Sequence, residues 1–251
     1  MQGLSLFSGI GGLDLAFEQA GGTVIAMCEI NSFCQRVLRR HWPDVPVFWN
    51  VKELHGSDVS RTVDVIYGGF PCQPFSVAGD QRGKDDSRYL WPEFSRLVSE
   101  IKPRWIVAEN VPGILRIAAD DVCSDLERQG YSVGIWDFEA ASVGAQHRRE
   151  RIFFVAHSGR SLQQGIQKTC DFREENEKGS AFTAQRSGCT HKEFTGSNFG
   201  RRTEPGMDRA AHEISHRVLI LTERLRALGN AVVPRQAYPV FRAVMEADEQ
   251  D

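Results

Sequence analysis

The stretch LSLFSGIGGLDLAFEQAGGTVIAMC, residues 4–28 of this 251-residue chain, decides the fold. It opens with a short apolar run, which the glycine-rich residues 8–12 (SGIGG) interrupt. Apolar residues then recur at helical spacing from Leu13 to Ala20, and Gly21-Gly22 separates them from a second apolar run. Strand, glycine turn, helix and strand in this order predict an α/β fold with an open sheet.

The following residues continue the alternation of strands and helices. The expected elements are a helix capped by Asn31, a strand at residues 63–67, a helix at 90–101, a strand at 105–108, a helix at 122–129 and paired strands at 131–138 and 151–156. In such a sheet, ligands bind at the carboxyl ends of the strands. Glu29, Cys72 and Glu109 each follow an expected strand and are therefore predicted to share one rim.

Apolar residues become sparse after the paired strands. Between residues 157 and 208, the few large apolar side chains are scattered among Gly, Ser, Thr, Gln and charged residues. Burial of these few side chains cannot offset the entropy lost when so long a segment becomes ordered. The segment must therefore pack against the first domain or a partner, or remain partly disordered. Helical periodicity returns at residues 219–228 and in a final helix after Pro234.

The composition excludes several classes of protein. With 41% hydrophobic and 25% charged residues, the chain is neither disordered nor collagen-like nor a coiled coil. It has no apolar run of membrane-spanning length and no basic secretory signal, which predicts a soluble cytoplasmic protein without a membrane partner. The six cysteines form no Cys-x-x-Cys pair, and Cys170, Cys189 and His191 lack zinc spacing, so we expect neither a disulfide framework nor a metal.

The turn Gly9-Ile10-Gly11-Gly12 fits a nucleoside cofactor. Glycines let the backbone approach a ligand closely, and the following helix directs its first amides towards an anionic group. Glu29, about twenty residues further on, is placed to accept hydrogen bonds from ribose hydroxyls. Because the order G-x-G-G differs from G-x-G-x-x-G, a purely structural tight turn is an equal alternative on this motif alone.

Cys72 is the strongest candidate for a nucleophile. It lies in GFPCQPFS (residues 69–76) between two prolines, in a turn that follows a buried strand and would present the thiol. A thiolate there can attack an electrophile if loop amides or a cation lower its pKa. Cys28, Cys34 and Cys123 are interpreted instead as small buried residues.

Charged groups complete the candidate site. Glu109 at a strand end, in an apolar wall, can hold a proton near neutral pH, with a surface or helix-capping role as an equal alternative. The run QHRRER at residues 146–151 gathers cations at one edge of the sheet. Arg149 and Arg151 are expected on the same face of a strand, where they can reach one anionic or carbonyl-rich ligand, and a solvated surface is the alternative.

Seven motifs follow one another along the chain: FSGIGGLDLAFEQAG, CEIN, GGFPCQPFSVAG, DSRYLW, ENVPG, RRERIFFVA and GNAVVP. In this order they resemble the motifs of the cytosine-C5 DNA methyltransferases. The resemblance covers most of residues 1–156 and returns at about 203–245. It implies a Rossmann-like, S-adenosylmethionine-dependent methyltransferase sheet at residues 1–157, a small irregular target-recognition region at 158–212, and a returning part of the catalytic domain at 213–251.

The resemblance also implies roles for the catalytic residues. Cys72 matches the thiolate that adds to C6 of cytosine, and Glu109 matches the acid that hydrogen-bonds N3. Asn110 would hold the loop, and Arg151, with Arg149, would contact the base carbonyl or order the site. The activated C5 would take a methyl group from S-adenosylmethionine, leaving S-adenosylhomocysteine.

The same matching implies a cofactor pocket and a surface for double-stranded DNA. The cofactor residues are Phe7, Gly9, Gly11, Gly12, Leu13, Glu29, Ile30, Asn50, Pro71, Leu90, Asn230 and Val232. Because C6 is hidden in a stacked duplex, the target cytosine would be flipped out under a closing loop around residues 73–88. The DNA-contacting residues are expected to be Gln73, Ser76, Arg201 and Arg202, with a merely solvated position as the alternative for the two arginines.

Three positions depart from the family's pattern. Residues 49–51 (WNV) stand where Gly-Asp-Ile is often found, so Asn50 would accept a hydrogen bond from the adenine amino group through its amide oxygen. His147 stands where glutamine is usual. Ala231 stands where a serine hydroxyl often contacts the cofactor, which leaves only backbone contacts there.

These expectations converge on a monomeric DNA (cytosine-5-)-methyltransferase in the cytoplasm of a prokaryotic or phage-infected cell. A cytosine-C5 methyltransferase of tRNA with the same core is the alternative enzyme. A non-catalytic module that binds a nucleoside cofactor is the alternative from another class, and the combination of Cys72, Glu109 and Arg151 argues against it. The sequence leaves the DNA target and any partner restriction enzyme open.

Overall fold

The computed structural model describes residues 1–59, 62–71, 89–145, 149–159 and 227–250. Within these residues, seven strands form one sheet in the order β3-β2-β1-β4-β5-β7-β6. The strands are β1 (Gln2–Leu6), β2 (Thr23–Cys28), β3 (Val47–Phe48), β4 (Val65–Gly69), β5 (Trp105–Asn110), β6 (Ser132–Phe138) and β7 (Arg151–His157). The first five strands run parallel, and β7 runs antiparallel to both β5 and β6. The expected open α/β sheet is confirmed.

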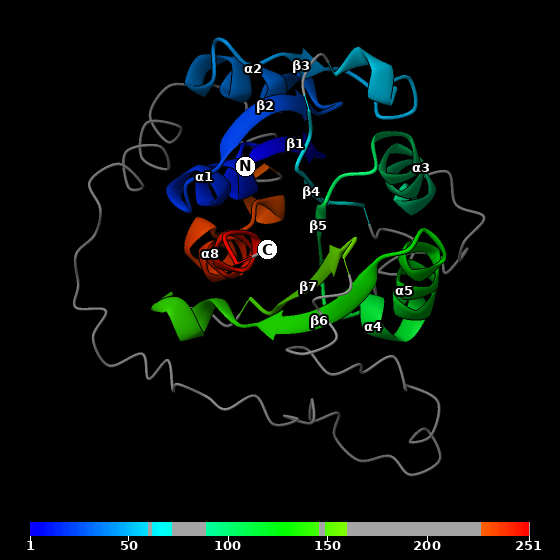
Figure 1. The fold of residues 1–251 in the computed structure, drawn as a ribbon. Helices are drawn as coiled ribbons and strands as arrows, with labels where there is room; N and C mark the ends of the chain where they lie inside the picture. Colours follow the sequence, from blue (N-terminus) through cyan, green and yellow to red (C-terminus); the bar gives the residue numbers. More distant parts are fainter. Residues whose placement is uncertain (60–61, 72–88, 146–148, 160–226, 251) are drawn as a thin grey trace.

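Helices cover both faces of the sheet (Figure 1). One face carries α1 (Gly12–Gln19), α2 (Ser32–His41) and α8 (Pro234–Asp248), and the other carries α3 (Trp91–Ile101), α4 (Ile114–Ile117) and α5 (Ala119–Arg128). Two 3-10 turns, η1 (Gly56–Asp58) and η4 (Ala140–Val143), lie in the connections. Asn31 caps α2 as expected, because its side chain accepts hydrogen bonds from the amides of Phe33 and Cys34.

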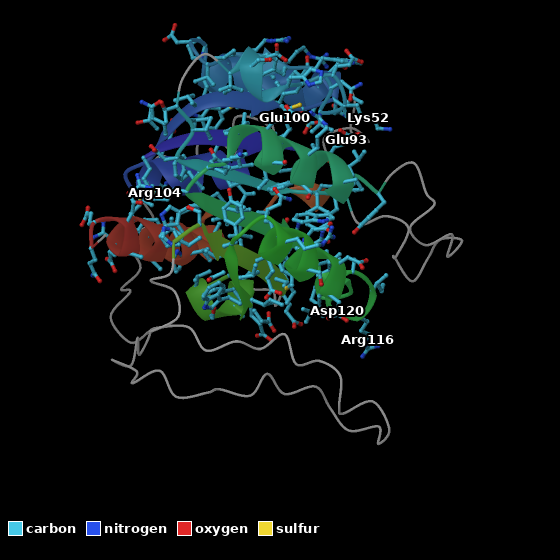
Figure 2. The ribbon with its side chains drawn as sticks, turned by 45° about the vertical axis from the view of Figure 1, so that its right-hand side comes forward. Lys52, Glu93, Glu100, Arg104, Arg116 and Asp120 are labelled. Carbon is cyan, nitrogen blue, oxygen red and sulfur yellow. The ribbon has the colours of Figure 1, made fainter. Side chains whose placement is uncertain are left out.

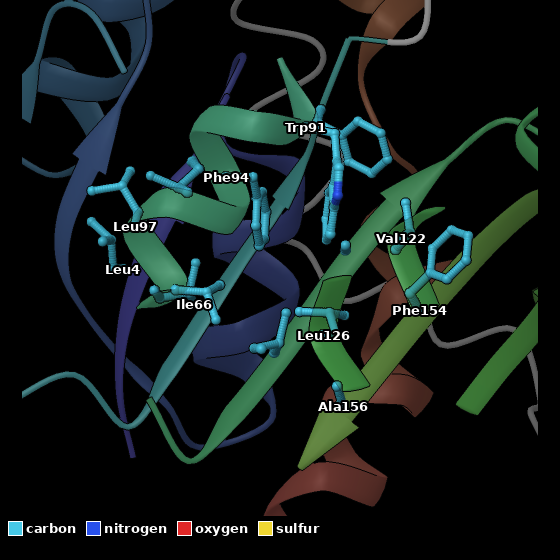
Figure 3. Packing of buried hydrophobic residues seen from close by; sticks show 14 of the residues in the cluster. Leu4, Ile66, Trp91, Phe94, Leu97, Val122, Leu126, Phe154 and Ala156 are labelled. Atoms are coloured by element: carbon cyan, nitrogen blue, oxygen red, sulfur yellow. The ribbon is translucent and has the colours of Figure 1, made fainter. Parts of the chain in front are cut away.

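The larger apolar cluster lies between the sheet and α3, α4 and α5 (Figure 3). Ile66 of β4 and Phe94 of α3 are both fully buried in it. Trp91 stacks on Phe94 with ring centroids 5.3 Å apart, and its indole N–H donates to Asp125 at 2.8 Å. This hydrogen bond ties α3 to α5 and satisfies the polar atom that the tryptophan carries into the core.

The opposite face holds a cluster of three fully buried aromatic rings. Phe17 of α1, Tyr67 of β4 and Phe241 of α8 have centroids 4.9 to 5.3 Å apart. They pack the last helix against the first helix and the centre of the sheet, at distances where aromatic pairs attract. The final helix expected after Pro234 is therefore confirmed, and it packs against α1 and β4.

Three strands differ from the sequence prediction. β4 begins and ends two residues later than expected, and the two-residue strand β3 was not expected. β5 continues through Glu109 and Asn110, which pair with Phe153 and Ile152 of β7. Glu109 therefore lies inside the strand, where the backbone ladder fixes it, instead of after the strand.

Some expectations concern residues outside the described part of the chain. They include the loop at residues 73–88, the region at 158–212 from residue 160 onwards, and all but the end of the helix at 219–228. Of the helices that the structure describes, none combines the length and the apolar character needed to cross a membrane.

Replacing Phe241 with alanine should lower the free energy of unfolding by about 3–5 kcal/mol, because the cavity would open between α1, β4 and α8. Urea unfolding measured by far-UV circular dichroism tests this. The control is Ile117→Ala on α4, where the side chain is 37% exposed. That change should alter the free energy by about 0.5 kcal/mol or less. Equal effects of the two changes would contradict the proposed anchoring of α8.

Candidate active site

The carboxyl ends of the parallel strands bring the predicted site residues to one edge of the sheet. The glycine turn follows β1, Glu29 follows β2, Phe70-Pro71 follows β4, and Glu109 lies next to the end of β5. These segments are far apart in the sequence, yet neighbouring parallel strands end side by side. The edge is therefore the place where an α/β sheet of this kind binds ligands.

The turn after β1 has a left-handed backbone at alternate residues. Phe7, Gly9 and Gly11 have φ angles of 55°, 57° and 90°. Among the described residues, a Cβ atom at Gly9 would meet no heavy atom within 4 Å, whereas one at Gly11 would lie 2.5 Å from the ring of Trp42. Gly11 is therefore required by packing, and Gly9 borders open space. The positive φ at Phe7 costs energy that surrounding contacts must offset.

Hydrogen bonds from β2 and its extension hold this turn. The Gly9 amide donates to Oε2 of Glu29 at 2.8 Å, and the Ser8 amide donates to the carbonyl of Cys28 at 3.2 Å. Oε1 of Glu29 accepts a hydrogen bond from the Asn31 amide at 2.7 Å. Backbone amides thus orient both carboxylate oxygens of Glu29, and each oxygen keeps a further lone pair for a ligand.

A buried carboxyl group that sequence reasoning missed lies beneath the turn. Asp14 of α1 is fully buried and accepts a hydrogen bond from the Tyr67 hydroxyl at 3.0 Å. Burial raises the pKa of Asp14 to about 7, while hydrogen bonds from Ser5 and Tyr67 lower it in part. The Ser5 hydroxyl also shares a 2.8 Å hydrogen bond with the hydroxyl of Ser8. The only sequence signal was an aspartate between apolar positions of the helix.

Two exposed apolar side chains lie beyond β2 and β3. Ile30 is 59% exposed and Trp49 is 55% exposed. The Glu29 amide donates to the carbonyl of Phe48 at 3.0 Å, which sets the residues after β2 beside those after β3. Ile30 was expected at the cofactor. Trp49 was missed, although a tryptophan directly before Asn50 was a signal in the sequence.

Asn50 stabilises a turn. Its Oδ1 accepts a hydrogen bond from the Lys52 amide at 3.1 Å, and its Nδ2 donates to Glu53 at 2.8 Å. The amide oxygen keeps one further lone pair, so a hydrogen bond to an adenine amino group stays a prediction. The carboxylate of Glu53, held beside it, is a second acceptor at this position.

Arg96 of α3 anchors the segment after Asn50. It donates to the carbonyls of Val51 and Leu54, both at 2.9 Å. Its other nitrogens contact the carboxylates of Glu93 at 2.8 Å and Glu100 at 2.5 Å, on the outer side of α3 (Figure 2). The fork of the guanidinium thus fixes residues 51–54 against the helix, and with them the turn that carries Asn50.

Glu109 is the central charged group of the described site. Its side chain is 9% exposed, and Oε1 lies 2.7 Å from Nε of Arg151, whose side chain is 12% exposed. Burial raises the pKa of Glu109 to about 7, while the charges of Arg151 and Arg149 lower it in part. A Cβ atom at Gly69 would lie 2.5 Å from Oε2 of Glu109, so a larger residue there would displace this carboxylate. The surface-glutamate alternative is therefore excluded.

Asn110 connects this carboxyl to the end of β4. It is 3% exposed, donates through Nδ2 to the carbonyl of Phe70 at 3.0 Å, and accepts from the Val111 amide at 2.9 Å. The expected role of holding a loop agrees with this geometry, because Pro71 follows Phe70 directly. Pro71 itself is half-buried.

The expectation that Arg149 and Arg151 share a face of one strand is wrong. β7 begins at Arg151, and Arg149 precedes it with a φ angle of 35°. Arg151 binds Glu109, whereas Arg149 donates to the carbonyls of Gly229 and Ala231 at 2.6 and 2.7 Å. The left-handed turn at Arg149 breaks the alternation of the strand, so the two guanidinium groups bind different partners.

The returning segment lies against the start of α1. A Cβ atom at Gly12 would be 2.6 Å from the carbonyl oxygen of Val232, so the two backbones are in direct contact. Val232 is buried and Asn230 is exposed. Leu13 packs into the apolar cluster under α1, and Leu90, the N-cap of α3, packs against the other cluster.

Several predicted site residues lie outside the described part of the chain: Cys72, Gln73, Ser76, Arg201 and Arg202. Among the residues described, no group of three or more His, Cys, Asp or Glu side chains is arranged to hold a metal ion.

Comparison with known proteins identifies the family. The sequence model of the C-5 cytosine-specific DNA methylases matches residues 1–202. This chain is a member of that family. Its seven-stranded, Rossmann-like sheet is the fold of S-adenosylmethionine-dependent C5 methyltransferases.

Curated relatives of this chain are bacterial type II methyltransferases. M.NgoMIV of Neisseria gonorrhoeae is 38% identical over 162 residues, which are 61% of this chain and 50% of the relative. M.FnuDI of Fusobacterium nucleatum is 36% identical over 160 residues, 62% of this chain and 46% of the relative. The chain thus spans about half the length of these relatives.

Solved structures share the fold. A DNA modification methyltransferase encoded in a prophage of E. coli has a TM-score of 0.56 and 30% identity, covering 68% of this chain and 52% of that chain. DNMT2 of Spodoptera frugiperda has a TM-score of 0.53 at 24% identity, covering 62% of this chain and 49% of that chain. The second likeness concerns the fold alone.

Titration of Glu109 should appear in the pH dependence of stability. Because its pKa is raised from 4.5 to about 7, its stabilising contribution is complete below pH 4.5 and is lost as the pH rises through about 7. The free energy of unfolding of Glu109→Gln, taken relative to that of the wild type, should therefore rise by on the order of 3 kcal/mol as the pH increases from about 5 to 8.

Urea unfolding at several pH values measures this difference. Burial also raises the pKa of Asp14 and Asp137 to about 7, so only the comparison with the wild type isolates Glu109. A difference that stays constant with pH would contradict the assignment.

Proposed function

We propose that the protein transfers a methyl group from S-adenosylmethionine to C5 of cytosine in double-stranded DNA. The observation that carries the proposal is the buried carboxyl of Glu109, near half-protonation at neutral pH and in contact with Arg151. It stands at the same sheet edge as the glycine turn, and Asn110 links it to the residues just before Cys72. Family membership supports the same reaction.

The residues at the edge suit S-adenosylmethionine. No atom of the described residues lies within 4 Å of a Cβ placed at Gly9, and Glu29 offers an oriented carboxylate to ribose hydroxyls. Ile30 and Trp49 offer apolar surface to an adenine ring. When bound, the cofactor would supply an electrophilic methyl group for C5.

The chain's own residues would prepare the base for this transfer. The Cys72 thiolate would add to C6, and the electron pair of the C5–C6 double bond would shift onto C5, delocalised through C4 to N3, so that C5 becomes nucleophilic. Glu109 would supply a proton at N3, a role that requires its neutral form, which burial favours. Arg151 would orient Glu109 and stabilise negative charge on the base carbonyl.

Product release would reverse the addition. A base would remove the C5 proton, the C5–C6 double bond would form again, and Cys72 would leave as the thiolate. Because the reaction begins on C6, the cytosine must leave the base stack at a cost of about a few kcal/mol. Gln73, Ser76 and the residues around Arg201 and Arg202 are the proposed contacts to the DNA.

The alternative substrate is tRNA with the same core chemistry. The relatives named as type II methyltransferases favour DNA. The likeness to DNMT2, at 24% identity, concerns the fold and favours no substrate. Methyl transfer to duplex DNA and to tRNA, measured side by side with labelled cofactor, separates the two. Equal or greater activity on tRNA would overturn the choice of DNA.

Changing Cys72 to alanine should reduce methyl transfer by at least about a thousandfold, because no other group can form the bond to C6. Cofactor affinity, measured by equilibrium dialysis, should stay within about threefold of the wild type, since a charge-free change leaves the cofactor's contacts in place. The matched control is Cys123→Ala on α5, which should keep its turnover.

A duplex with 5-fluorocytosine in a methylated site provides an independent test. Fluorine cannot leave C5 as a proton does, so the wild type should accumulate a covalent complex that survives a denaturing gel. The target site is first found by bisulfite sequencing of DNA from cells that express the chain. Adduct formation by Cys72→Ala, or its absence with the wild type, would contradict the thiol mechanism.

A further inference from the structure

The backbone of Arg149 adopts a conformation that few non-glycine residues adopt. Its φ angle is 35°, and it directly precedes Glu150 and the start of β7. A left-handed conformation at a side-chain-bearing residue costs free energy, so the contacts of the residue must hold it there. Among the described residues, the hydrogen bonds of Arg149 are made with the C-terminal part of the chain.

The guanidinium group of Arg149 binds residues 229–231, which precede α8. One nitrogen, Nη2, donates to the carbonyls of Gly229 at 2.6 Å and Ala231 at 2.7 Å. These carbonyls flank Asn230, the residue expected to face the cofactor. Two short charge-assisted hydrogen bonds to residues on either side fix the backbone of Asn230 without contacting its side chain.

The backbone of Arg149 is held by the same part of the chain. Gln236 of α8 is fully buried, and its Nε2 donates to the carbonyl of Arg149 at 2.8 Å and to that of Phe138 at 2.5 Å. Arg149 therefore donates to the segment before α8 and accepts from α8 itself. The side chain and the backbone of Arg149 are thus both held by the C-terminal part of the chain.

The charge of Arg149 also acts on Glu109. It lowers the pKa of that carboxyl, together with Arg151, against the effect of burial. Glu109 in turn raises the pKa of Arg149, while burial and Arg151 lower it. The charged groups that face Glu109 among the described residues are thus Arg151 of β7 and Arg149 before it.

We propose that Arg149 is a positioning residue that couples the cofactor edge to the catalytic acid. Its Nη2 group holds residues 229–231 against the start of α1, where Val232 contacts Gly12, and it lies two residues before Arg151, whose Nε is 2.7 Å from Glu109. The inference rests on the proposed function, because it assigns Asn230 to the cofactor and Glu109 to proton donation. Of the two roles expected for Arg149, contact with the base carbonyl or ordering of the site, it assigns the second, since Nη2 already donates to two carbonyls.

Two substitutions separate the hydrogen bonds of Nη2 from the charge. Arg149→Gln removes both, whereas Arg149→Lys keeps the charge but ends in an ammonium group on a shorter side chain, which does not reach the position of Nη2. The matched control is Arg104→Ala, which removes an ion pair of 2.8 Å to Asp248 at the far end of α8. This control removes one contact of α8, while the Trp105 indole still donates to Asp248 at 2.9 Å, and it leaves the segment before α8 untouched.

The first measurement is hydrogen exchange of the cofactor-free protein. Amides of residues 229–233 should exchange at least about tenfold faster in both Arg149 variants, because charge-assisted hydrogen bonds are lost. Calorimetric binding of S-adenosylhomocysteine should weaken by about tenfold or more in both. Arg104→Ala should change neither quantity more than about twofold.

The second measurement is the pH profile of kcat. If protonated Glu109 is the active form, activity falls as the pH rises past its pKa. Arg149→Gln should move this fall to higher pH, because a positive charge that lowers the pKa of Glu109 is removed. Arg149→Lys should leave it in place. A residue with a merely structural role would not move the profile.

The outcomes distinguish this inference from the proposed function. If hydrogen exchange and S-adenosylhomocysteine affinity are unchanged in both variants, the proposal that Arg149 positions residues 229–231 is overturned. A pH profile that moves equally in the lysine and glutamine variants, or in neither, would overturn the coupling to Glu109. A wild type that binds no S-adenosylhomocysteine would instead overturn the proposed function. If Arg149→Gln does not fold, the exchange and affinity of Arg149→Lys decide.

Discussion

The contact between Glu109 and Arg151 is the interaction on which the described site depends. Both side chains are almost completely buried, and their atoms approach to 2.7 Å. Taking either charge out of water is expensive, so each is tolerable only because the other, or a proton, compensates for it. The same burial that makes the pair costly brings the pKa of Glu109 to about 7. An acid of this kind is suited to proton transfer at neutral pH.

The antiparallel pairing of β5 with β7 makes this contact possible. Asn110 lies opposite Ile152, so Arg151 enters the sheet next to the end of β5. One residue of slip would turn every side chain of β7 to the other face. The register is held by apolar packing on both faces of the sheet, where Phe153 and Phe154 are fully buried in opposite clusters.

The C-terminal segment completes the other half of the edge. Phe241 packs against Phe17 and Tyr67, and the carbonyl of Val232 lies on Gly12. Residues more than 200 positions from the glycine turn thereby become its neighbours. Arg149 is hydrogen-bonded to this segment through both its side chain and its backbone, and these bonds hold its backbone in an unfavourable conformation.

Periodicity and motif spacing were sufficient for the sheet, the glycine turn and the rim that Glu29 and Glu109 share, because these depend on local patterns. Strand ends were placed less well, since the ladder to β7, and not the sequence of β5, extends that strand through Asn110. Nothing in the sequence distinguishes the partners of Arg149 from those of Arg151. Likewise, Asp14 could not be assigned to a buried site, because its partner Tyr67 belongs to another element. The sequence alone determined which residue types meet at the edge. The tertiary structure decided which atoms pair there, because burial, register and backbone turns depend on contacts between distant segments.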